Sequence, residues 1–231
     1  MEAPQDKSLK DLEPRLFDEA EAGDTKGKIL EAAFRRLARE GYAALSMREI
    51  ARDAGVNHAL INYHFRSKDQ LVIAVLDEAN RQLLERQKRM YGAPGGFAEK
   101  WAQARRFYKS DLASGFVRMQ AELWAASLSD AGLREKFLPR LTAWKEVVRG
   151  AVRDAVATLA ANGVKLPPPF DAEVIACWIS EFWLGMEFAD LLGAREDQVP
   201  HRAALDAMQR LLEQLDARVQ KKAPGRRRRK K

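Results

Sequence analysis

The chain has 231 residues, of which 46% are hydrophobic, so it can bury a sizeable core in one large domain or two smaller ones. No uninterrupted apolar run approaches the roughly 18 residues that cross a bilayer, and the N-terminal segment is acidic, which argues against a membrane span or a secretion signal. Cys177 is the single cysteine, and the three histidines lack the spacings of zinc sites. We therefore expect a soluble protein of a reducing compartment, with no disulfide, metal or cofactor.

The formal net charge is +7, but the basic residues are concentrated at one end of the chain. Residues 221–231 hold eight of the 40 lysines and arginines and none of the 33 acidic residues. The rest of the chain is therefore close to neutral, and the net charge by itself does not predict DNA binding.

The two ends of the chain have the composition of unstructured segments. Residues 1–23 contain seven acidic and three basic residues with only a weak apolar pattern, and predict an acidic flexible arm. Residues 220–231 carry the basic run and predict a disordered tail. Such a tail either attracts nucleic acid without sequence preference or has no role.

The first strong helical pattern runs from about Thr25 to Glu40. Gly41 follows and predicts its end, because glycine readily adopts the positive φ of a residue that terminates a helix. The predicted buried stripe of this helix consists of Leu30, Ala33, Phe34 and Leu37.

Two short helices are expected next. Ser46 and Glu49 form a Ser-x-x-Glu capping box, which predicts a helix of about two turns that ends at Gly55. Asn57 is a suitable N-cap for a second short helix that reaches about Phe65. Two short helices joined by a tight glycine turn are typical of a helix-turn-helix, whose second helix enters the major groove of DNA.

A further capping box, Ser67 with Gln70, opens the next helix, and nearly everything beyond it has helical periodicity. The sequence therefore predicts an all-α protein of about nine helices. We expect an acidic arm (1–23), a three-helix DNA-binding head (24–70), a helical bundle for ligand binding and dimerisation (71–219) and the basic tail (220–231). The predicted breaks within the bundle lie at 91–96, 129–132, 162–169 and 193–200.

The head closely resembles the tetracycline-repressor (TetR/AcrR) family of bacterial regulators. The resemblance is carried by Gly41-Tyr42-x-x-Leu-Ser-Met-Arg-Glu-Ile-Ala, by Ala54-Gly55-Val56 and by Tyr63-His64-Phe65-x-Ser67-Lys68-x-x-Leu71. It implies a homodimeric, cytoplasmic bacterial repressor that binds a palindromic operator and is released by a small-molecule inducer. The sequence shows no catalytic constellation, so we do not expect an enzyme.

The family pattern divides the head residues into those that read bases and those that contact phosphate. Base contacts are expected from the start of the recognition helix, although Asn57 can instead only cap it and His58 can be a solvated side chain. Leu60 and Asn62 depart from the family pattern, where a small hydroxyl residue and a tyrosine are common. The predicted base-reading residues are Asn57, His58, Ala59 and Asn62, and the predicted phosphate contacts are Lys26, Ser46, Arg48, Tyr63, His64 and Lys68.

The last two helices are the expected dimer interface. The helix at about 170–192 is apolar over most of its circumference, and the final helix repeats apolar residues at spacings of three and four. In the family these helices form a four-helix bundle across the dimer axis, whereas the alternative is packing within one chain. The predicted interface residues are Cys177, Glu181, Gly185 and Ala189 in the first helix and Leu205, Met208, Leu212 and Leu215 in the second.

Aromatic residues are abundant in the bundle and indicate either ordinary core packing or a ligand cavity. The stretch 116–124, the motif Leu133-Arg134-x-x-Phe137 and Trp144 resemble the C-terminal domain of choline-responsive betaine-pathway repressors of the family. Aromatic walls with a carboxylate such as Glu122 or Glu181 suit a cationic ligand. An aromatic ligand is the alternative that we expect. The predicted cavity residues are Phe116, Glu122, Trp124, Trp144, Trp178 and Phe182.

Two rival functions remain open from the sequence. A ligand-independent, nucleoid-type protein could coat DNA through the basic tail. A helical enzyme could assemble scattered carboxylates, although the sequence contains no phosphate loop, metal set or neighbouring Cys-His pair.

Overall fold

The computed structural model describes residues 24–222, so the predicted acidic arm and nearly all of the predicted basic tail lie outside the described residues. Within this range the regular structure is helical throughout, which confirms the predicted all-α class. The nine described helices are α2 (Thr25–Ala44), α3 (Met47–Ala54), α4 (His58–His64), α5 (Lys68–Gly92), α6 (Phe97–Ser114), α7 (Phe116–Ser129), α8 (Ala131–Ala161), α9 (Ala172–Leu191) and α10 (His201–Lys222).

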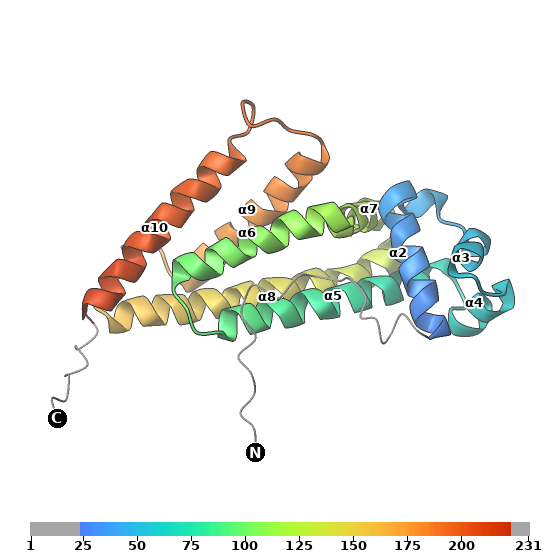
Figure 1. Ribbon diagram of the computed structural model, residues 1–231, viewed down its shortest axis with the longest axis horizontal. Helices are drawn as coiled ribbons and strands as arrows, with labels where there is room; N and C mark the ends of the chain where they lie inside the picture. Colours follow the sequence, from blue (N-terminus) through green and yellow to red (C-terminus); the bar gives the residue numbers. More distant parts are fainter. Residues whose placement is uncertain (1–23, 223–231) are drawn as a thin grey trace, which may run out of the picture.

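Helices α2, α3 and α4 form a small head at one end of an elongated molecule (Figure 1). The regular part of α2 stops at Gly41, whose φ of 82° and ψ of 172° lie outside the helical region, as the sequence predicted. Its predicted stripe is buried, with Leu37 fully enclosed. Gly55 ends α3 in the left-handed conformation, at φ 65° and ψ 31°.

The helix caps were predicted with mixed success. Asn57 caps α4 by accepting a hydrogen bond from the Ala59 amide at 2.9 Å, and Ser67 caps α5 by accepting one from the Gln70 amide at 3.2 Å. The capping box at Ser46 is wrong, because the Ser46 side chain makes no capping hydrogen bond and the Glu49 carboxylate bonds to Arg36 instead. An ion pair with a buried guanidinium replaces the expected bond to the backbone.

Helices α5, α6 and α8 run along the length of the body, and α9 and α10 form its outer side (Figure 1). The four breaks predicted between the body helices are present. A fifth break, between α6 and α7 at Gly115, was not predicted. Gly115 has φ 84°, and a Cβ there would lie 2.8 Å from the Cβ of Ala38 in α2, so this turn passes very close to the head.

One continuous apolar core joins the head to the body. It contains Ile29 and Leu37 of α2, Leu71 and Val72 of α5, and Met119 of α7, together with neighbouring side chains. A second cluster lies around Tyr108, Trp183, Met186 and Leu205, and a third around Val148, Val152 and Ala176. The head therefore cannot move independently of α5 and α7, because it shares a buried core with both helices.

Among residues 24–222, none of the helices combines the length and apolar character needed to span a bilayer.

Candidate DNA-binding surface and ligand cavity

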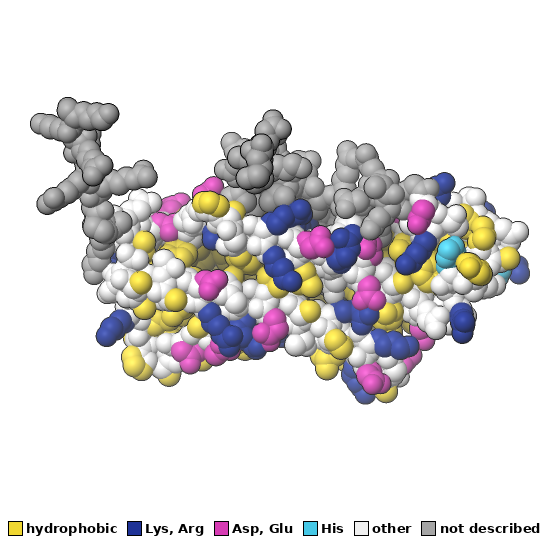
Figure 2. Space-filling view, turned by 90° about the horizontal axis from the view of Figure 1, so that it is seen from below, with side chains coloured by type: hydrophobic (Ala, Val, Ile, Leu, Met, Phe, Trp, Pro, Cys, Tyr) yellow, Lys and Arg dark blue, Asp and Glu magenta, His cyan; other side chains and the backbone are white. Residues whose placement is uncertain are grey.

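Helix α4 turns one face into the head and presents the rest to solvent. Ile61 is fully buried, whereas Tyr63 is 81% exposed and Leu60 is 40% exposed. The remaining predicted contact residues of this helix are exposed as well: Asn57, His58, Ala59, Asn62 and His64. Figure 2 shows histidine side chains at the head end of the molecule beside hydrophobic and basic ones.

His58 and Asn62 lie together on the exposed face of α4. The Asn62 amide nitrogen is 3.4 Å from Nδ1 of His58, one helical turn away. Asn57, in contrast, uses its side-chain oxygen as the N-cap, which is the structural alternative left open by the sequence. The polar base-reading candidates therefore converge on His58 and Asn62, with the apolar surface of Leu60 and Ala59 beside them.

The predicted phosphate contacts differ in how they are held. Lys26 and Arg48 are exposed, and Ser46 is half-buried at the start of α3. The Lys68 ammonium donates to the Ala43 carbonyl at 3.3 Å and lies 4.3 Å from the centre of the Tyr42 ring. Partial burial lowers the pKa of Lys68, with a smaller opposing effect of Asp69. Lys68 is thus a positioned cation rather than a freely solvated one.

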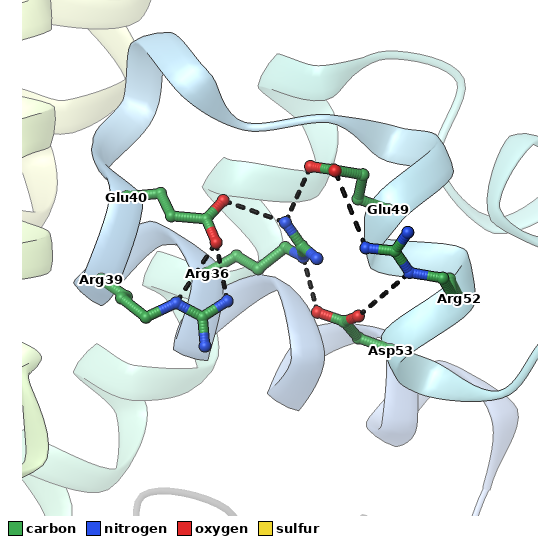
Figure 3. A network of polar contacts seen from close by, with 6 residues as sticks. All are labelled: Arg36, Arg39, Glu40, Glu49, Arg52 and Asp53. Carbon is green, nitrogen blue, oxygen red and sulfur yellow. Dashed lines mark hydrogen bonds and ion pairs between the residues drawn. The ribbon is translucent and has the colours of Figure 1, made fainter.

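A buried arginine fixes α3 against α2. Arg36 is 5% exposed, and its Nε donates to Asp53 at 2.6 Å while its Nη1 donates to Glu49 at 2.7 Å and to Glu40 at 2.9 Å. Figure 3 shows how Arg39 and Arg52 complete this network from outside. The hydrogen bond to Asp53 raises the pKa of Arg36, and the same bond lowers the pKa of Asp53, so both groups are charged.

The sequence did not single out Arg36, although its position within the buried face of α2 was a usable signal. A charged residue among apolar positions needs partners, and Glu49 and Asp53 stand four residues apart on α3, where they share one face. The network therefore sets the angle at which α3, and the turn to α4, leave α2.

The body encloses a cavity of about 70 Å³ among α5, α6, α7, α8 and α9. This volume holds a few water molecules and is below the ~300–1,000 Å³ of typical ligand sites. Of the predicted cavity residues, Phe116, Trp124 and Trp144 line it.

Three predicted cavity residues do not line it. Trp178 is 61% exposed and Phe182 is 37% exposed, since both lie on the outer face of α9. Glu122 points to the head, where its carboxylate is close enough to Gly41 that a Cβ at Gly41 would lie 2.5 Å from Oε2. The assignments of Trp178, Phe182 and Glu122 to the cavity were therefore wrong, because helical spacing alone does not show which face of a helix turns inward.

The cavity wall carries polar groups that the sequence analysis did not identify. Asp111 is 7% exposed and forms an ion pair with Arg86, whose guanidinium also lies 4.6 Å from the centre of the Phe107 ring. Glu187 of α9 lines the same cavity. Burial, with a further contribution from Asp111, raises the pKa of Glu187 to about 8. Two carboxyl groups, of Asp111 and Glu187, therefore line the cavity, and the first of them is paired with Arg86.

The predicted interface helices present two kinds of residue. Cys177, Glu181 and Gly185 are exposed along α9, and Ala189 is half-buried. On α10, Leu205 is 7% exposed and packs in the cluster of Tyr108, Trp183 and Met186 of its own chain. Leu205 thus packs within its own chain, which is the alternative to a dimer contact. Leu211, in contrast, is 48% exposed. The other predicted residues of this helix, Met208, Leu212 and Leu215, are half-buried.

Comparison with known proteins identifies the head. Residues 29–75 match the family described as "Bacterial regulatory proteins, tetR family". This segment belongs to the tetR family. It comprises α3, α4 and most of α2, together with the first turns of α5, and so agrees with the resemblance predicted from the sequence motifs.

Solved structures resemble the whole tetR-like architecture. The transcriptional regulator FadR from Bacillus subtilis, in complex with stearoyl-CoA, is 20% identical with a TM-score of 0.64, over 80% of this chain and 96% of its own. A protein from Saccharomonospora viridis in complex with choline is 21% identical with a TM-score of 0.62, over 83% and 95%. A TetR transcriptional regulator from Legionella pneumophila is 20% identical with a TM-score of 0.60, over 83% and 96%. The chain therefore shares its fold with these structures, and its head matches the tetR family.

Replacing the central cation should destabilise the tetR-family head. We expect Arg36→Met to lower the melting temperature by roughly 5 °C or more, because Glu40, Glu49 and Asp53 lose the buried cation that holds them together. Circular dichroism during thermal unfolding measures the change. Arg35→Met is the matched control, because Arg35 is exposed and pairs with Glu31 one turn away on the same helix. Equal melting temperatures for the two variants would contradict the role of the network.

Glu187 should make stability depend on pH. Its pKa is raised in the folded chain, so below the unfolded value the carboxyl is protonated in both states and has no penalty. As the pH rises to about 8, ionisation favours the unfolded chain, and stability falls. We expect Glu187→Gln to gain at least ~3 °C in melting temperature over the native chain between about pH 5 and pH 8. The exposed Glu181, replaced by Gln, should show no such trend, and a flat difference for both would refute the assignment.

Proposed function

We propose that the protein is a sequence-specific transcriptional repressor that binds a palindromic operator as a homodimer and is released by a small molecule. The observation that carries this proposal is the exposed polar face of α4, held on a rigid helical support within a tetR-family head. As a bacterial DNA-binding regulator it would act in the cytoplasm, where the DNA is.

The chemistry of α4 suits the major groove. Asn62 can pair with both N6 and N7 of adenine, and His58 can donate to or accept from a base edge. Leu60 and Ala59 offer apolar surface that suits the methyl group of thymine. Lys26 and Arg48, both exposed, provide the charge that fixes the head on the phosphate backbone.

Dimerisation is supported by the outer face of α9 and α10. Trp178, Phe182 and Leu192 are exposed apolar side chains of this face, at 61%, 37% and 86%, and Leu211 of α10 is exposed too. Exposed apolar side chains gathered on one side of a protein are typical of an interface. Gly185 lies on the same helix and permits close approach of a second helix.

Release by a ligand is supported by the position of α7. One side of this helix lines the cavity through Phe116 and Trp124, and its other side packs in the core shared with α2 through Met119 and Leu123. A molecule that enlarges the cavity therefore presses on the helix that supports the head. The complexes of two similar structures with stearoyl-CoA and with choline support a small-molecule site in this body.

The rival function is a nucleoid-type protein that coats DNA without reading it. The rival function depends on the basic tail, nearly all of which lies outside the described residues. The polar face of α4, in contrast, lies within them. Sequence preference of the purified protein separates the two functions.

Changing Asn62 should alter which sequences are bound. Selection of binding sites from random DNA should return a palindrome for the native chain, and Asn62→Ala should relax the preference at one base pair of each half-site, at a cost of about 1–3 kcal/mol there. Arg48→Ala is the contrasting variant. It should weaken binding to all sequences alike and reduce the salt dependence by about one unit. Binding without any sequence preference would overturn the proposed function.

Filling the outer face of α9 should prevent dimerisation. A Cβ at Gly185 meets no atom within 4 Å in the single chain, so Gly185→Arg should fold normally and yet block a partner helix. Sedimentation velocity should show a dimer for the native chain and a monomer for the variant. Gly150→Arg is the matched control, since Gly150 is an exposed helical glycine of α8 with equally open space. A native chain that sediments as a monomer would contradict the proposed dimer.

A further inference from the structure

The charges at the cavity wall are unequally compensated. Arg86, behind the wall, is occupied by Asp111, and the lining Arg140 pairs with Asp77 at 2.6 Å on the outside of the body. Within residues 24–222, Glu187 has no hydrogen bond or ion pair, although it faces the cavity. After the ion pairs are matched, one carboxyl group is left over in an enclosed space.

The neutral polar groups of the wall point to the same kind of ligand. Among the described residues, the buried side-chain oxygens of Asn80 and Gln87 have no hydrogen-bond partner. Both residues line the cavity, two turns apart on one face of α5. Buried acceptors without a donor cost free energy, so the cavity favours a ligand that carries several hydrogen-bond donors.

Aromatic rings supply the remaining wall. Trp124 and Phe188 meet edge to face with ring centres 5.0 Å apart, and Trp144 lines the cavity from α8. Aromatic faces attract an organic cation, and they also bind its apolar substituents.

We propose that the cavity binds a protonated amine, with its ammonium N–H groups donating to the carboxylate of Glu187 and to the oxygens of Asn80 and Gln87, and its apolar part between Trp124 and Trp144. The proposal rests on the ligand-responsive function proposed above and specifies its ligand. A primary or secondary ammonium satisfies the unpartnered acceptors, whereas a quaternary ammonium has no N–H to donate.

Amine binding and proton release are coupled at this site. Burial and the neighbouring Asp111 raise the pKa of Glu187 to about 8, so the empty cavity holds Glu187 protonated near neutral pH. A cation favours the ionised form, and binding therefore releases the proton. The titratable groups that line the cavity with Glu187 are Asp111 and Tyr108 from α6, Tyr91 from α5 and Arg140 from α8, whereas α7 contributes the uncharged Gln120. Arg86 lies behind Asp111 as its ion-pair partner.

The test uses the full chain and four probes of similar shape: benzylamine, benzyl alcohol, benzoate and benzyltrimethylammonium. Isothermal calorimetry gives the affinity of each, and measurements in buffers of different ionisation enthalpy give the protons released. We expect benzylamine to bind most tightly and to release up to one proton near neutral pH. Its apparent affinity should rise by up to about tenfold per pH unit below pH 8.

Two variants locate the effect. Glu187→Gln should weaken benzylamine about tenfold and abolish proton release, because the neutral amide cannot ionise. Glu173→Gln, at an exposed carboxylate on the same helix that belongs to neither the predicted interface nor the cavity, should change neither quantity. Tighter binding of the alcohol, benzoate or the quaternary ion, or benzylamine binding that is absent or equal in both variants, overturns the proposal.

Failure of this proposal can be distinguished from failure of the proposed function. If benzylamine binds through Glu187 but does not release the protein from its operator DNA, the amine site is supported and ligand-induced release is contradicted. If a neutral or anionic compound releases the protein from DNA, the regulator stands and the amine site is wrong.

Discussion

The packing of α7 between the head and the cavity is the constraint on which the rest of the structure depends. Met119 and Leu123 are fully buried in the core that also contains Ile29 and Leu37 of α2. The same helix supplies Phe116 to the cavity wall. Because interiors are closely packed, a ligand that enlarges the cavity would displace its walls, and α7 is a wall helix that also packs on α2. The turn at Gly115, which passes very close to α2, leaves little space to absorb such a movement.

The buried charges of the head are all paired, whereas those of the body are not. In the head, one buried cation, Arg36, is surrounded by three carboxylates, so every charge has a partner and the angle between α2 and α3 is fixed. In the body, Asp111 is paired with Arg86 but Glu187 is not. Full compensation favours rigidity, which suits a DNA-reading surface, whereas an unpaired carboxyl group in a cavity favours a charged ligand.

The described surface also separates the two proposed roles in space. Helix α4 lies at the head end, whereas α9 and α10 belong to the body (Figure 1). The latter two helices carry the exposed apolar side chains. The cavity lies between them. The ligand proposed at Glu187 on α9 would therefore influence both the proposed dimer face, through that helix, and the head, through α7.

The sequence alone determined the all-α class, the two short helices with the Gly55 turn, the N-cap at Asn57 and the family of the head, because these depend on local periodicity and on turn residues at fixed spacing. It did not predict the ionic role of Arg36, the inward position of Glu187 or the outward positions of Trp178 and Phe182. Helix α9 is apolar around most of its circumference, so periodicity could not show which face turns inward. Only the packing of α9 against α8 and α7 decided that, because tertiary contacts select the face that each helix buries.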